Sequence, residues 1–126
     1  MVYYRAGSPQ KRTYTWYING DISVGSEQGA VYRLLHPCYA SFLQLHVKGA
    51  PTGQSLIVDI KDLGVSLFST LPEIDAGTNI ENGNEVFSSR NLAFGNTITM
   101  AVTQVGSVNP GTDLTVSLEV LEKLEV

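Results

Sequence analysis

LTVSLEV, residues 114–120, alternates apolar and polar side chains at every position. Because successive side chains of a β-strand point to opposite faces, this segment predicts a strand that buries its leucines and valines on one face. The same alternation occurs in residues 41–48 (SFLQLHVK), 56–61 (LIVDIK) and 97–103 (TITMAVT). No longer segment shows the spacing of an amphipathic helix. The sequence therefore predicts an all-β domain.

Turn-forming residues separate the predicted strands. Asparagine and glycine tolerate the positive φ angles of tight turns, and they occur, some with proline, at residues 50–53 (APTG), 82–83 (NG) and 109–111 (NPG). A further pair, Asn19–Gly20, predicts a hairpin over residues 13–24, with a bulge inside one longer strand as the alternative.

The number of strands and the spacing of turns indicate the architecture. About eight short strands with a turn about every 8–12 residues are typical of an antiparallel β-sandwich. The Cys…Trp…Cys pattern of immunoglobulin domains is absent, because Trp16 precedes Cys38, the single cysteine. A jelly-roll sandwich is therefore the predicted fold, and a chain of 126 residues is the size of one domain.

Charge divides the chain into two parts. Residues 1–12 carry three basic residues and no acid, a charge of +3, whereas residues 13–126 carry −7. The first segment shows neither a helical nor a strand period, and we predict an extended N-terminal arm over residues 1–12 before a single sandwich domain over residues 13–126. Its basic residues are too sparse to predict nucleic-acid binding, and docking onto an acidic protein surface fits them as well.

Aromatic residues near the N-terminus are candidates for contact with a partner. Tyr3 and Tyr4 have no local core to enter within an arm, and aromatic and arginine side chains are enriched at interfaces. The alternative, that the arm folds back on its own sandwich, stays open. The predicted partner-binding residues are Tyr3, Tyr4, Arg5, Lys11, Arg12 and Trp16.

No residue pattern predicts catalysis. Ser55 lacks the second glycine of a nucleophile elbow, and His36 and His46 lack metal-ligand spacing with each other or with Cys38. Cys38 is interpreted as a core residue, because free cysteine is among the most buried residue types. We therefore predict no enzyme activity, no catalytic residues, no cofactor and no small-molecule substrate.

Acidic residues need separate consideration. Asp59 and Asp62, three residues apart on a strand, project to opposite faces and are predicted to be solvated. Residues 75–85 are rich in side-chain oxygens, which calcium prefers, but they do not match an EF-hand loop. A long polar connection between strands is the favoured interpretation of this segment, and no metal site is predicted.

Hydropathy predicts a protein that does not enter membranes. No apolar run approaches the roughly 20 residues needed to cross a bilayer. The first residues lack the apolar stretch of a secretory signal, so we expect the protein to be made and folded in a cytoplasm.

Three segments carry a resemblance to a known family: residues 50–60 (APTGQSLIVDI), 64–70 (GVSLFST) and 104–116 (QVGSVNPGTDLTV). Together they resemble a β-sandwich module of tailed bacteriophages, found in head decoration (cement) proteins and in tail-fibre or receptor-binding subunits. The resemblance covers about residues 16–120 and consists of strand and turn patterns. Residues 1–12, Cys38 and residues 75–85 have no counterpart in it.

The resemblance implies a virion structural protein. A single domain without catalytic motifs favours a head decoration protein that stabilises the capsid lattice from the outer capsid surface, assembled in the host cytoplasm. The implied partners are the major capsid protein or another virion protein and two further copies in a homotrimer. The alternative is a receptor- or carbohydrate-binding module at the phage tail, which an exposed Trp16 would favour.

Overall fold

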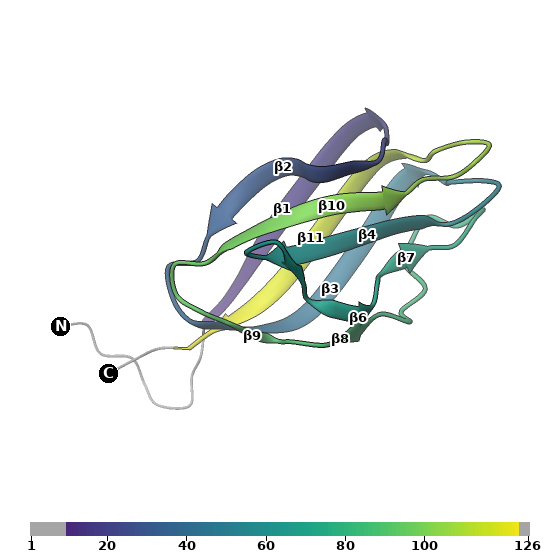
Figure 1. The fold of residues 1–126 in the computed structure, drawn as a ribbon. Coiled ribbons are helices and arrows are strands. Elements are labelled where there is room, and N and C mark those ends of the chain that lie inside the picture. The colour runs from purple at the N-terminus through teal and green to yellow at the C-terminus, as the bar shows by residue number, and fades with distance from the viewer. Residues whose placement is uncertain (1–9, 124–126) are drawn as a thin grey trace.

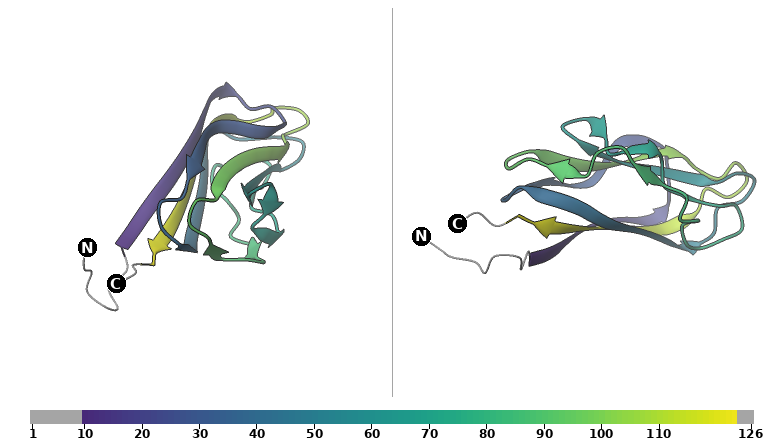
Figure 2. Two further views of the ribbon diagram at one scale, coloured as in Figure 1. Left: turned by 60° about the vertical axis from the view of Figure 1, so that its left-hand side comes forward. Right: turned by 90° about the horizontal axis from the view of Figure 1, so that it is seen from below.

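The computed structural model describes residues 10–123, which form two facing β-sheets (Figures 1 and 2). Sheet A is 4-stranded, in the order β1 (Gln10–Asp21), β11 (Thr112–Glu122), β3 (Cys38–Gly49) and β9 (Asn91–Leu92). Sheet B is 5-stranded, in the order β2 (Gly25–Arg33), β10 (Thr97–Gln104), β4 (Leu56–Asp62) and β5 (Val65–Ser66), with β7 (Glu73–Ile74) also paired with β4. A 2-stranded ribbon consists of β6 (Phe68–Thr70) and β8 (Val86–Phe87).

The strand pairing is that of a jelly roll. The early strands pair with the late strands in reverse order: β1 with β11, β2 with β10, β3 with β9 and β4 with β5, all antiparallel. The chain is therefore one long hairpin, turned at β4–β5 and rolled so that alternate strand pairs lie in opposite sheets (Figure 1). The predicted all-β, jelly-roll-like sandwich is confirmed.

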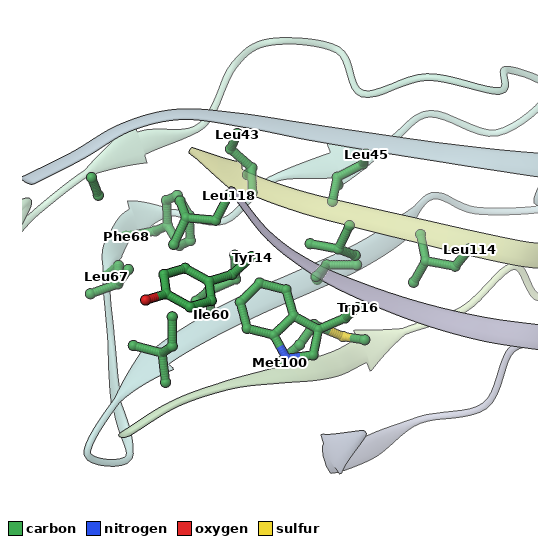
Figure 3. Close-up of a cluster of buried hydrophobic side chains, with 14 of the residues drawn as sticks. Tyr14, Trp16, Leu43, Leu45, Ile60, Leu67, Phe68, Met100, Leu114 and Leu118 are labelled. Carbon is green, nitrogen blue, oxygen red and sulfur yellow. The ribbon is translucent and has the colours of Figure 1, made fainter. Parts of the chain in front are cut away.

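The core lies between the two sheets (Figure 3). The alternation read from the sequence decides which side chains enter it: Leu43, Leu45 and Val47 on β3 are buried, and their neighbours point outward. On β11 the leucines and valines of residues 114–120 are all buried. Interdigitated aliphatic side chains in this layer supply most of the stabilisation, at about 25 cal/mol for each Å² of apolar surface buried.

The hairpin predicted over residues 13–24 is wrong, and the alternative is observed. β1 runs through Asn19–Gly20 to Asp21, with a register shift against β11 between Ile18 and Asp21. Gly20 adopts a φ of 78° and donates its N–H to Asp113 Oδ1 at 2.8 Å. An Asn–Gly pair provides a positive φ angle for a hairpin or for a bulge, and continued pairing with β11 makes this one a bulge.

Two further predictions need correction. β1 begins at Gln10, so residues 10–12 belong to the sandwich rather than to an arm, while residues 1–9 lie outside the described part of the chain. Asp59 is buried instead of solvated, and Ser66 on the neighbouring β5 offsets the cost of its burial by donating its hydroxyl to Asp59 Oδ1 at 2.6 Å. Asp62 is partly buried and accepts a bond from the Asn96 amide.

Residues 75–85 form the long polar connection that the sequence predicts, between β7 and β8. The connection follows the edge of β3, where Asn79 donates its side-chain amide to the carbonyls of Val47 and Lys48.

No helix capable of spanning a bilayer occurs within residues 10–123.

Candidate binding surface

The outer face of sheet A is a regular surface formed by the three long strands β1, β11 and β3. On β1, β11 and β3, the residues that alternate with the core positions point away from sheet B. Strand register places Tyr17, Thr115 and His46 in one row across the sheet, and Thr13, Glu119 and Phe42 in another. The outer face of sheet A comprises Lys11, Thr13, Thr15, Tyr17, Tyr39, Phe42, Gln44, His46, Thr115, Ser117, Glu119 and Leu121.

Exposed aromatic rings distinguish this face. Tyr17 is 55% exposed and Phe42 is 58% exposed, and the residues between them in the register are mostly uncharged and polar. Tyr39 adds a third ring near the start of β3. Aromatic side chains among few charges are typical of the central part of a protein–protein interface.

Neighbouring side chains hold the Tyr39–Phe42 region in place. The Arg90 guanidinium stacks 4.1 Å from the Phe87 ring centroid and 5.7 Å from that of Tyr39. Its Nη1 also donates to the carbonyl of Ala40 at 2.8 Å. These contacts occupy the edge of β3, so partner contacts would be made by the face rather than by this edge.

A group of ionisable residues closes the sandwich where β1 begins and β11 ends. Arg12 Nε lies 3.3 Å from Oε2 of the buried Glu122. This oxygen has no hydrogen-bond partner among the described residues, so the contact is an ion pair without the alignment of a hydrogen bond.

Burial raises the pKa of the Cys38 thiol, and the Glu122 carboxylate raises it further. Burial also raises the pKa of Tyr14, with Cys38 as the next cause. The thiol is buried, which confirms Cys38 as a core residue, and it donates to the carbonyl of His36 at 3.0 Å.

Trp16, predicted from the sequence as a partner-binding residue, lies in the core of the sandwich. Its side chain is 1% exposed, and its Nε1 donates to the carbonyl of Ala30 on β2 at 2.8 Å. The ring packs edge-on against Tyr32, 5.3 Å between centroids, and so joins the edges of the two sheets (Figure 3 shows its place in the core). The physical reason is the phase of β1, which turns Tyr14 and Trp16 inward and Tyr17 outward.

The other predicted binding residues fall in different places. Lys11 lies on the outer face of sheet A, whereas Arg12 points toward Glu122 at the end of the sandwich. Tyr3, Tyr4 and Arg5 lie outside the described residues. Sequence reasoning missed Tyr17 and Phe42 as candidates, although the alternation in residues 41–48 already pointed Phe42 away from the core.

The chemistry available on this surface is that of binding. Its rings offer apolar contact, and its hydroxyl and amide groups offer hydrogen bonds. Within residues 10–123, no three His, Cys, Asp or Glu side chains gather closely enough to hold a metal ion. Comparisons with models of protein families, with curated proteins and with solved structures find no match to this chain.

Proposed function

We propose that this protein is a non-enzymatic structural protein of a bacteriophage particle, specifically a head decoration (cement) protein that binds and stabilises the capsid lattice. The observation that carries the proposal is the outer face of sheet A, where the exposed rings of Tyr17 and Phe42 lie among uncharged polar residues. The jelly roll supports it by analogy, since this fold is common in viral capsid proteins. The strand and turn patterns at residues 50–60, 64–70 and 104–116 support the phage assignment.

The proposed contact combines apolar burial with steering by charge. Burying one large apolar side chain contributes about 1.5–3 kcal/mol, whereas an exposed ion pair contributes about 0–1 kcal/mol. Tyr17 and Phe42 therefore hold the protein on the major capsid protein, and Lys11 at the margin of the face steers its approach. Tyr3, Tyr4 and Arg5 are proposed to add a contact from the N-terminal segment.

The test measures binding to phage particles that lack this protein, by co-sedimentation and by electron microscopy of the labelled chain. Tyr17→Ala with Phe42→Ala is expected to weaken binding at least about tenfold, because truncating central aromatic residues costs most at an interface. Val86→Ala is the matched control, since Val86 is comparably exposed but lies on β8, outside this face. Full binding by the double variant would contradict the proposal.

The alternative role is a receptor- or carbohydrate-binding module at the phage tail. An exposed Trp16 would have favoured this role, but Trp16 is buried. Tyr17 and His46, which share one row of the outer face, remain available to contact a sugar. Glycan-array binding that Tyr17→Ala abolishes, without particle binding, would favour this role over decoration.

A further inference from the structure

The two ends of the sandwich differ in charge. The terminal end is where β1 begins and where β2, β4 and β11 end, and the far end is where β1 ends and where β2, β4 and β11 begin (Figure 1). Charged residues close to the terminal end are the bases Lys11, Arg12, Arg33, Lys61, Arg90 and Lys123 and the acids Asp62, Glu119 and Glu122. Those close to the far end are the acids Asp21, Glu27, Glu73, Asp75 and Asp113 and the base Lys48.

The six bases of the terminal end outnumber its three acids, a net charge of +3, whereas the far end has five acids and one base, a net charge of −4. Glu122 is buried beside Arg12, and Asp62 accepts a hydrogen bond from the Asn96 amide. Arg33 and Lys123 are exposed there. The described part of the molecule therefore has a positive terminal end and a negative far end.

Exposed apolar side chains project from loops at both ends. At the terminal end, backbone bonds from Gly95 to Leu34 and from Leu63 to Thr97 hold three loops side by side. These loops and the adjoining β5 expose Leu35, Leu63, Val65 and Phe94, of which Phe94 is 64% exposed. At the far end, Val24 and Val108 are exposed, and Val108 is the most exposed at 75%.

We infer that copies of this protein associate head to tail, with the terminal end of one copy docked on the far end of the next. The two ends of one molecule are complementary in charge, and both offer apolar side chains for burial. Contact between two terminal ends or two far ends would instead oppose like charges. A second copy of the chain therefore presents, at its far end, a negatively charged surface that complements the terminal end.

Such a contact is heterologous, because it joins two different surfaces. Heterologous contacts close into rings when the rotation between copies permits and otherwise extend as filaments, whereas a two-fold dimer buries the same surface twice. The contact leaves Tyr17 and Phe42 on the outer face of sheet A free, whereas Lys11 and Glu119 belong to both surfaces. It therefore goes beyond the proposed capsid binding, and either can hold without the other.

The experiment uses two variants of the full chain, each with one altered end. The terminal-end variant carries Leu35→Glu and Phe94→Glu, and the far-end variant carries Val24→Lys and Val108→Lys; all four positions are exposed, so both variants are expected to fold. Analytical ultracentrifugation should show association of the unaltered chain that weakens with salt. Each variant alone should associate at least about tenfold more weakly. Mixed in equal amounts, they should form a dimer and nothing larger, because each retains one intact and complementary end.

Three results would overturn the inference. The first is an unaltered chain that stays monomeric at every concentration, and the second is a far-end variant that still self-associates through its intact terminal end. The third is a monomer whose terminal end binds vesicles of phosphatidylserine and phosphatidylcholine, which would assign the basic, apolar end to an anionic membrane. Tyr17→Glu with Phe42→Glu serves as the control, since it should abolish particle binding and leave self-association unchanged.

Discussion

Trp16 and Tyr17 are neighbours on β1 in opposite environments, which makes them a matched pair for a stability test. Trp16 is 1% exposed and bonds to β2, whereas Tyr17 points outward. Trp16→Ala should lower the free energy of unfolding by about 3–5 kcal/mol, because it leaves a cavity and an unpaired carbonyl at Ala30. Tyr17→Ala should change it by about 0.5 kcal/mol or less. Urea denaturation of both variants gives the comparison, and equal losses would show that the phase of β1 is assigned wrongly.

Cys38 and Tyr14 should make the free energy of unfolding fall as the pH rises into the alkaline range. Both have a pKa raised chiefly by burial, so the folded chain keeps these protons at pH values where the unfolded chain loses them. Their contribution is complete below the pKa values of the unfolded chain and is lost as the pH rises through the raised values of the folded chain. Urea midpoints should therefore decline across this alkaline range. Tyr14→Phe keeps the ring and removes one titrating group, so its midpoint should decline less; an identical decline would exclude a contribution from Tyr14.

At the scale of the strand, the ion pair between Arg12 and Glu122 holds the beginning of β1 against the end of β11. Arg12→Ala should cost about 1–2 kcal/mol, since it leaves the buried Glu122 carboxylate without its cation, although the partial exposure of Arg12 limits the loss. Glu122→Leu added to Arg12→Ala should recover part of this cost, because no unpaired charge is then buried. Chemical denaturation of the single and double variants measures both effects. Additive losses would show that the two side chains do not interact.

For the molecule as a whole, the true start of the sandwich can be tested by truncation. A chain beginning at Gln10 keeps all of β1, whereas one beginning at Thr13 loses three residues that pair with β11, including Arg12. We expect the shorter chain to be less stable by about 1–3 kcal/mol, from lost strand pairing and the unpaired Glu122. Thermal and urea unfolding of the two truncated chains check this. Equal stability of the two truncated chains would show that residues 10–12 do not contribute to the sandwich and belong to the arm.

The same truncation beginning at Gln10 tests the proposed N-terminal contact. If Tyr3, Tyr4 and Arg5 contact the capsid, this chain should bind particles more weakly than the full chain. Tyr3→Ala with Tyr4→Ala should weaken binding more than Arg5→Ala does, because apolar burial contributes more than an exposed charge. Binding equal to that of the full chain would leave recognition to the outer face of sheet A.

Much of the fold follows from local sequence. Alternation in residues 41–48, 97–103 and 114–120 determined the strands and the residues that share a face, because the side-chain period of a strand is two. The order of short strands and the absence of an immunoglobulin pattern were enough to favour the jelly roll. Local pattern also predicted the polar connection at residues 75–85 and the buried Cys38.

Tertiary structure alone decided the rest, because alternation defines two faces without saying which one meets the opposite sheet. Packing against Tyr32 and Ala30 buried Trp16 and left Tyr17 outside. Pairing with a strand about 100 residues further along the chain made Asn19–Gly20 a bulge and extended β1 back to Gln10. The separation of charge between the two ends arises in the same way, since rolling the long hairpin brings bases from distant segments to one end and acids to the other.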